Sequence, residues 1–256
     1  MRRSLILFFI FICFNNLSAS EHFKESRSTH FIVFYNNAPE GFIKSLLEKA
    51  EFYYESITED LGFRRFNFWL WDNRAKIYIY DDANSYRLAS SQPAWSGGAV
   101  MPNHKIIQSF PASKDFLDTI LPHEMGHIIF REFVGFNNPG VTLWLDEGVA
   151  SYQEKRRYSQ ADAFIRRLID QDSFINLRKL SSYHSLASLD SGSIDIFYAQ
   201  SYSIVDFLIK MFGREKFVLF CQNLRDYRNL DDALRLTYSL QGISQLEKAW
   251  IGYLKK

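Results

Sequence analysis

The sequence has very few cysteines and therefore little capacity for disulfide bonds. Only two cysteines occur in 256 residues, Cys13 and Cys221. Cys13 lies in an apolar segment at the N-terminus, so a chain that has lost this segment can form no internal disulfide. Cys221 stands in an apolar helical pattern, EKFVLFCQNL, and we interpret it as a small core residue rather than a nucleophile.

The sequence also lacks an apolar run long enough to span a bilayer comfortably. The longest, SLILFFIFICF at residues 4–14, follows two arginines and precedes the small polar segment NNLSAS. This order is typical of a secretory signal peptide, which we assign to residues 1–20. An uncleaved anchor is the alternative. The protein is expected to be exported, either periplasmic or secreted, with a soluble domain over residues 21–256.

An excess of charge of one sign is missing as well. The chain has 30 Lys and Arg against 29 Asp and Glu, and removal of the two arginines before the apolar run leaves 28 against 29, a formal charge of −1. A chain this close to neutral has no electrostatic footprint for nucleic acid, which we exclude as a partner. Contact with a membrane is expected only through the signal segment, if it is retained.

The first half of the chain alternates between strand and helix patterns. Four strands are predicted, at 29–37, at 75–82 and, joined at Pro102-Asn103, twice within 95–110. Two helices are predicted, at 39–62 with Gly62 as its end, and at 82–90, opened by Asn84 or Ser85.

Helical patterns dominate the second half, at 115–134, 142–157, 160–170, 195–213, 214–224 and 244–254. Pro122 lacks an N–H and is comfortable only in the first turn of a helix, so we expect the helix in the first of these segments to start near Asp118 or Thr119. The basic run Lys155-Arg156-Arg157 is typical of a solvated helix end.

The segment LPHEMGHIIF places His123 and His127 four residues apart, with Glu124 directly after the first. Residues i and i+4 lie on one face of a helix, so both imidazoles can point at one metal ion. Zinc binds such nitrogens at about 2.0–2.1 Å and lowers the pKa of a bound water to about 7. Glu124 can then act as the general base toward this water. Two chance histidines in a structural helix remain an alternative.

Catalytic zinc usually has three protein ligands, and the segment WLDEGVASY offers Glu147 as the third. Glu147 follows His127 by twenty residues, across the NNPG turn at 137–140, on a helix that can return beside the first. Its neighbours are apolar, and a carboxylate buried among them is costly without a partner such as a cation. The alternative is an exposed Glu147 on a polar face. Asp146 and Ser151 are candidates for hydrogen bonds that orient the ligands.

HEMGH followed by WLDEGVASY resembles the gluzincin metallopeptidases, a peptidase MA-like family related to the aminopeptidase N branch. The resemblance covers about residues 29–220. It implies an α+β, zincin-like fold, with a small twisted mixed sheet and an active-site helix followed by a mostly helical C-terminal half. It also implies one zinc ion held by His123, His127 and Glu147, with Glu124 as the general base.

The resemblance extends to FYAQSYSIVDFLIKMFGREKF at 197–217, which is similar to the family helix that begins with a tyrosine over the active site. It implies that Tyr198 donates a hydrogen bond to the oxyanion of the tetrahedral intermediate. Tyr202, one turn further along, is the second candidate, and either residue can instead be a packed aromatic. His104 and His184 are interpreted as surface or loop histidines, although each could approach the substrate.

One matching segment departs from the family pattern. Aminopeptidases of the family carry Gly-Ala-Met-Glu-Asn on the strand that lines the cleft, and its glutamate holds the free amine of the substrate. The corresponding segment here, GGAVMPN at 97–103, has no glutamate. Gly97, Gly98 and Ala99 are therefore predicted to bind the substrate backbone as part of an edge strand, without an amine anchor.

These features predict an exported zinc peptidase whose substrate is a peptide or protein, with internal cleavage favoured over aminopeptidase activity. Its single domain is expected to have a sheet-containing part at about 21–140 and a helical part at about 141–256. The competing hypothesis is a non-catalytic envelope protein that keeps the fold and binds a peptide or protein partner in the same groove.

Overall fold

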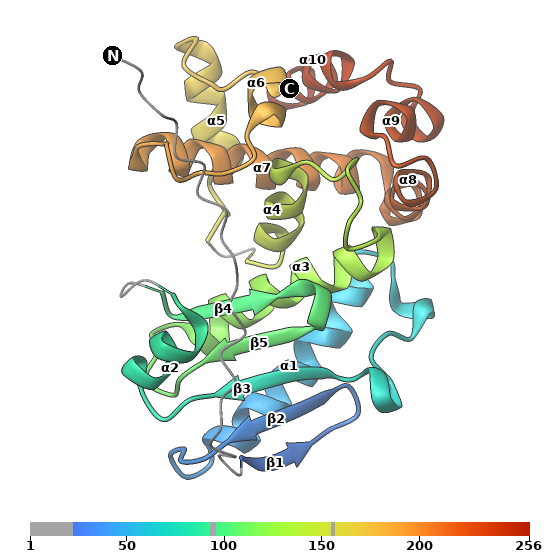
Figure 1. Cartoon of the computed structure of the whole chain (residues 1–256). Helices are drawn as coiled ribbons and strands as arrows, with labels where there is room; N and C mark the ends of the chain where they lie inside the picture. Colours follow the sequence, from blue (N-terminus) through green and yellow to red (C-terminus); the bar gives the residue numbers. More distant parts are fainter. Residues whose placement is uncertain (1–22, 93–95, 155–156) are drawn as a thin grey trace, which may run out of the picture.

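The computed structural model describes residues 23–92, 96–154 and 157–256, and Figure 1 shows the arrangement of its elements. The predicted signal peptide at 1–20 lies outside the described residues. Within the described ranges, no helix combines the length and the apolar character needed to cross a bilayer.

A five-stranded sheet lies at one end of the molecule, in the order β1-β2-β3-β5-β4 (Figure 1). The strands are β1 (Lys24–Arg27), β2 (Phe31–Tyr35), β3 (Ala75–Ile79), β4 (Gly98–Met101) and β5 (Ile106–Ser109). The three central strands run parallel, whereas β1 and β4 pair antiparallel at the two edges. The four predicted strands are confirmed. Sequence reasoning missed β1 because KESR is short and charged, without an apolar alternation.

The helices of the second half form a separate layer above the sheet (Figure 1). They are α4 (Leu143–Tyr152), α5 (Ala161–Asp170), α6 (Leu177–Ser182), α7 (Ser191–Phe212), α8 (Arg214–Tyr227), α9 (Leu230–Tyr238) and α10 (Ile243–Leu254). The α+β class, with a small mixed sheet and a mostly helical C-terminal half, is thereby confirmed. Sequence reasoning missed α6 and α9, which are among the shorter helices of this half.

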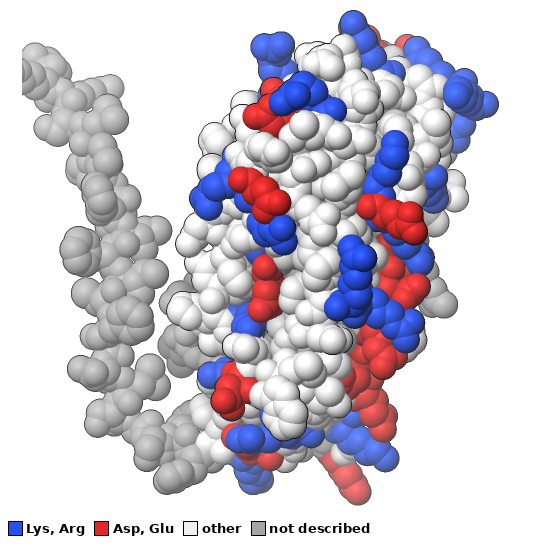
Figure 2. Space-filling view, turned by 90° about the vertical axis from the view of Figure 1, so that its right-hand side faces the viewer, with Lys and Arg blue, Asp and Glu red and all other residues white. Residues whose placement is uncertain are grey.

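Two helices connect the sheet to that upper layer. Helix α1 (Phe42–Asp60) packs against β2 and α3 (Leu121–Val134), and α3 also contacts β4 and α4. Helix α4 in turn packs along α7, so α3 and α4 lie at the centre of the fold. On the face of the molecule drawn in Figure 2, acidic and basic side chains are interspersed, in keeping with the near-neutral charge of the sequence.

The short helix α2 (Ala83–Ser90) forms where the sequence predicts it, but its cap differs from the prediction. Asp82, and not Asn84 or Ser85, is the N-cap residue, and its carboxylate accepts hydrogen bonds from the backbone N–H groups of both. Ser85 returns the contact through its hydroxyl to the Asp82 backbone, which completes a capping box. Aspartate is a strong N-cap, so the assignment shifts by two or three residues.

The motif helix begins later than expected. A wide π turn over Phe116–Ile120 precedes α3, which starts at Leu121 rather than near Asp118 or Thr119. Pro122 lies in the first turn of α3, where its missing N–H is harmless. The proline therefore marks the junction between the two helical geometries, immediately before the histidine motif.

Helix α4 is shorter than the predicted 142–157 and ends at Tyr152. Beyond Tyr152 the backbone hydrogen bonds span three residues instead of four. The N–H of Gln153 donates to the carbonyl of Ala150, and that of Glu154 donates to the carbonyl of Ser151. The carboxylate of Glu154 turns inward and is only 3% exposed. The early end of α4 thus returns Glu154 toward α3, which a continued helix would not do.

Glycines allow the backbones of α3, α4 and α7 to approach closely. A Cβ atom at Gly148 would lie 2.4 Å from the carbonyl oxygen of Ser201 on α7, and one at Gly126 would lie 3.0 Å from Cα of Ala150. No rotamer change can relieve a clash with backbone atoms, so these two positions fix the spacing between the central helices.

We expect Gly148→Ala to lower the free energy of unfolding by about 1–3 kcal/mol, because the added methyl group overpacks the α4–α7 contact. Gly252→Ala is the matched control. Gly252 lies on the exposed side of α10 with no atom within 4 Å of an added Cβ, so this change should stabilise the protein by about 0.5–1 kcal/mol. Urea unfolding measures both, and equal shifts in the two variants would contradict the close packing.

Candidate metal centre

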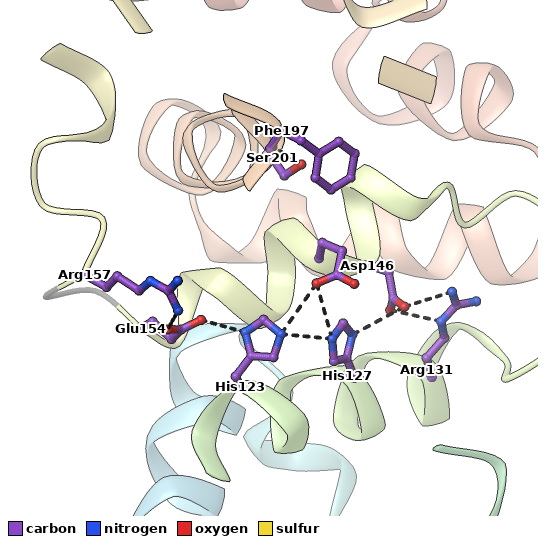
Figure 3. Close-up of polar contacts among 9 residues, drawn as sticks. His123, His127, Arg131, Asp146, Glu154, Arg157, Phe197 and Ser201 are labelled. Atoms are coloured by element: carbon purple, nitrogen blue, oxygen red, sulfur yellow. Dashed lines mark hydrogen bonds and ion pairs between the residues drawn. The ribbon is translucent and has the colours of Figure 1, made fainter. Parts of the chain in front are cut away.

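Three side chains from α3 and α4 point toward one spot (Figure 3). The Nε2 atoms of His123 and His127 lie 3.2 Å apart. Oε2 of Glu147 lies 3.5 Å from Nε2 of His123 and 3.6 Å from Nε2 of His127. In a tetrahedron with bonds of 2.0–2.1 Å, ligand atoms are separated by about 3.3–3.4 Å. The observed triangle has the dimensions of one face of a zinc coordination shell.

One hydrogen bond and one longer ion-pair contact behind the triangle indicate which way the imidazoles point their lone pairs. Nδ1 of His123 lies 2.7 Å from Oε1 of Glu154, and Nδ1 of His127 lies 3.4 Å from Oδ2 of Asp146. We assign the ring protons to these Nδ1 atoms because each faces a carboxylate oxygen. Both Nε2 atoms are then free to donate electron pairs to a metal, the arrangement usual for metal-bound histidines.

The third candidate ligand atom, Oε2 of Glu147, makes no hydrogen bond with the described residues. Oε2 of Glu147 is fully buried and finds no hydrogen-bond partner in the part of the chain that the structure describes. The side chain of Glu147 is 16% exposed, so the alternative of a solvated carboxylate on a polar helix face is wrong. A buried carboxylate oxygen facing two imidazole nitrogens fits a divalent cation.

When no metal is bound, the carboxylates around the triangle favour protonation of His123. Burial lowers the pKa of His123, but the contacts with Glu147 and Glu154 outweigh it and raise the pKa to about 10. For Glu147, burial raises the pKa, but the two imidazoles lower it below its ordinary value. In the metal-free chain His123 is therefore protonated on both ring nitrogens at neutral pH, and a bound metal has to displace the proton on Nε2.

The Asp146 carboxylate, which faces His127, is also bound by the guanidinium of Arg131. Nε and Nη2 of Arg131 each lie 3.0 Å from one oxygen of the Asp146 carboxylate, in a two-pronged ion pair (Figure 3). Burial raises the pKa of Asp146, but His127 and Arg131 lower it more, so the group stays ionised. Arg131 lies one turn beyond His127 on α3, and the pair orients Asp146 toward the imidazole.

Glu124 and Tyr198 both line a hollow of about 180 Å³ beside His123. Burial raises the pKa of Glu124, against the opposing effect of His123 and His127, and the net pKa is above its ordinary value. A carboxylate with a raised pKa is a stronger proton acceptor. Tyr198 lines this hollow, whereas Tyr202 does not line it, is 7% exposed and stacks on the rings of Tyr152 and Tyr158.

The predicted substrate strand, β4, is an edge strand as expected, but its glycines have a use within the fold. A Cβ atom at Gly97 would lie 2.5 Å from the Ser113 hydroxyl, and one at Gly98 would lie 2.7 Å from the Ile120 side chain. The carbonyl oxygen of Gly97 accepts hydrogen bonds from two serine hydroxyls. The glycines therefore let the π turn pack against β4, and contact of Gly97, Gly98 and Ala99 with substrate stays a prediction.

Two other histidines lie apart from the centre. His104 ends the short 3-10 turn after β4, and His184 lies in the loop between α6 and α7, and both side chains are exposed. Neither lines the hollow beside His123.

Sequence reasoning missed four residues around this centre: Arg131, Glu154, Arg157 and Tyr158. Arg131 had a signal, because its i+4 spacing from His127 places both on one face of α3. Glu154 and Arg157 had none, because they were assigned to a helix that in fact ends at Tyr152, and Tyr158 follows directly after that predicted helix. Arg157, interpreted as part of a solvated helix end, lines the hollow beside His123, while Lys155 and Arg156 lie outside the described residues.

Two comparisons with known proteins found a match. A sequence model of the Peptidase MA superfamily matches residues 71–256. Among solved structures, the chain is similar to yeast LTA4 hydrolase, determined in complex with Bestatin, with 15% sequence identity and a TM-score of 0.49. The similarity covers 90% of this chain but 39% of that one, so this chain spans well under half of its length. No curated protein matches the sequence.

We expect zinc to stabilise the chelator-treated protein by about 2.7 kcal/mol at a concentration of 100 Kd, a rise in Tm of about 5–10 °C. Glu147→Gln should lose most of this rise, because an amide oxygen is a far weaker zinc ligand than a carboxylate. Glu48→Gln, an exposed change on α1, should keep it. A full zinc response in Glu147→Gln would remove Glu147 from the ligand set.

The affinity for zinc is also expected to depend on pH. Because His123 is protonated below a pKa of about 10, acid competes with the metal, and affinity should rise about tenfold per pH unit between pH 6 and 9 for each displaced proton. Competition with a chromophoric chelator of known pH dependence measures this slope. A slope of zero would contradict the proton occupancy derived for the metal-free chain.

Proposed function

The chain belongs to the Peptidase MA superfamily, and from this premise we propose that it is a zinc-dependent peptidase that hydrolyses internal peptide bonds. The observation that carries the proposal is the convergence of one oxygen and two nitrogen electron-pair donors, from Glu147, His123 and His127, beside the carboxylate of Glu124. When bound there, zinc supplies a Lewis acid that polarises the scissile carbonyl and activates a water molecule for attack.

Glu124 is proposed to move the protons of the reaction. It lies next to His123 in sequence and lines the same hollow, so its carboxylate can accept the proton that the attacking water loses. The same group, now protonated, then donates to the amine that leaves. Burial raises the pKa of Glu124 above its ordinary value, which makes its carboxylate a stronger base toward the attacking water.

Tyr198 is proposed to stabilise the charge that develops on the carbonyl oxygen. Burial, together with the nearby Glu147 carboxylate, raises the pKa of Tyr198 above its ordinary value. The phenol therefore keeps its proton at neutral pH and remains a hydrogen-bond donor. A fixed donor of this kind contributes most in the transition state, where the negative charge on the oxygen is greatest.

Internal cleavage is favoured because the hollow offers no carboxylate for a free substrate amine. The segment 97–103 contains no acidic residue. Both oxygens of Glu154 are engaged, one by His123 and the other by Arg157. Among the described residues that line the hollow, this leaves Glu124, which the chemistry needs for itself. The outer edge of β4 is unpaired within the described sheet, so an extended substrate backbone can pair with it on either side of the scissile bond.

Export is also part of the proposal, and its support is the sequence alone. The two arginines, the short apolar run and the small polar segment at residues 1–20 have the order of a signal peptide.

We expect Glu124→Gln to lower kcat on a mixed peptide pool by about 10²–10⁴-fold, because the amide cannot accept a proton. Zinc content, measured on the same samples, should stay at the wild-type level. Equal hydrolysis by both proteins would contradict the mechanism. Peptide binding without hydrolysis by the zinc-loaded wild type would favour the non-catalytic binding protein instead.

Internal cleavage is tested with pairs of peptides that differ only in N-terminal acetylation. An enzyme without an amine anchor should hydrolyse both members at rates within about threefold of each other, and mass spectrometry should locate the cuts away from the first residue. A loss of activity of more than tenfold on acetylation, with release of single N-terminal residues, would show aminopeptidase action.

A further inference from the structure

Two hollows meet at Arg157, Tyr158 and Tyr198. The first, of about 180 Å³, is lined by His123, and the second, of about 250 Å³, is lined by Phe164 on α5 and Asp195 on α7. The three shared residues border both hollows, and the two hollows together are called the groove below. A peptide that occupies the metal centre has this groove as one path for its chain.

Arg157 is held in the wall of this groove by two contacts. Its Nη1 atom lies 3.1 Å from Oε2 of Glu154, and its guanidinium carbon lies 5.6 Å from the centre of the Tyr158 ring. Figure 3 shows the guanidinium beside Glu154, on the side away from His123. The side chain is nevertheless 62% exposed, whereas that of Glu154 is 3% exposed. The ion pair holds one end of the guanidinium, and the rest of this exposed side chain, which lines both hollows, has further N–H donors for a ligand.

The charged side chains that line the groove make Arg157 a selective binding position for acidic groups. Among the described residues of the two hollows, Arg157 is the one Lys or Arg side chain, and the acidic side chains are Glu124 and Glu154 in the first and Asp195 in the second. Away from the metal centre, Arg157 is therefore the point of the two hollows where a described side chain attracts an acidic ligand group. A guanidinium is planar and presents paired donors, which match a carboxylate in two-pronged geometry.

We propose that Arg157 binds a carboxylate of the substrate and so directs cleavage to bonds near an acidic group. The inference rests on the proposed peptidase function. One carboxylate and one imidazole separate the guanidinium from the ligand triangle. At about 3.3–3.6 Å per extended residue, a carboxylate bound there lies within about three residues of the scissile bond. The carboxylate can belong to an Asp or Glu side chain or to the C-terminus of the peptide.

The alternative role for Arg157 is purely structural, to neutralise Glu154 and thereby hold His123. The two roles differ in what they do to different substrates. A structural role affects all peptides equally, because every peptide needs the same metal centre. A carboxylate-binding role affects the ratio of kcat/KM between an acidic peptide and its neutral amide counterpart.

The test uses zinc-loaded full-length protein and peptides blocked at the N-terminus. One series replaces Gln by Glu at each of the three positions on either side of the cut, with an amidated C-terminus. A second series is neutral within the chain and ends in either a free carboxylate or an amide. The variants are Arg157→Gln, Arg157→Lys and, as the matched control, Arg235→Gln. Arg235 is an exposed arginine in an i,i+3 ion pair with Asp232 on α9.

The wild type and Arg235→Gln should hydrolyse the acidic member of at least one pair about tenfold faster than the amide member, a difference typical of one charge-assisted hydrogen-bonded contact. Arg157→Gln should reduce this ratio to about one while zinc content is retained, and Arg157→Lys should keep part of it. Discrimination in the first series identifies a side-chain carboxylate, and discrimination in the second alone identifies the C-terminus.

An equal fall of both members in Arg157→Gln, or an unchanged ratio, would overturn the inference. If zinc-loaded wild type hydrolyses no peptide, the peptidase function itself fails, and fluorescence anisotropy with the same labelled peptides then decides the question of Arg157. Tighter binding of acidic members that depends on Arg157 supports the inference in that case. Its absence, including the absence of any binding, overturns it.

Discussion

Three electron-pair donors meet in the interior of this protein at separations of 3.2–3.6 Å, and much of the surrounding structure serves to hold them there. Two of them come from successive turns of α3 and one from α4, so the axial spacing of one helix and its distance from the next set the geometry. Each imidazole is oriented from behind by a carboxylate, and each of these carboxylates is held by an arginine. The same pattern of histidine, carboxylate and guanidinium is thus repeated on both sides of the ligand triangle.

The chain reaches this arrangement through local departures from regular structure. The π turn before α3 ends at Ile120, two residues before Pro122, and Gly97 and Gly98 at the start of β4 make room for the Ile120 side chain. Helix α4 stops early, which brings Glu154 back to His123. The π turn comes directly before the helix with the histidine motif, and the early end of α4 comes two residues before Glu154.

The sequence predicted the centre better than its surroundings for a physical reason. His123, Glu124 and His127 belong to one helix, and i,i+4 spacing converts directly into proximity. Glu147 could be added because a carboxylate among apolar neighbours needs a cation. The strands of the sheet followed from apolar alternation, except for β1, whose charged sequence has none. Glu154 and Arg157 could not be found in this way, because their positions depend on where α4 ends, and no glycine or proline at 153–157 marks the true boundary.

The contact between Gly148 and the Ser201 carbonyl on α7 ties the residue after Glu147 to a segment some fifty positions later in the chain. Nascent polypeptide that has not yet added α7 has both histidines and the glutamate in its sequence, but it lacks the wall that sets the depth of α4. The depth of the third ligand atom is consequently set only after α7 has packed against α4, and a chain that stops before Ser201 lacks the contact that sets it.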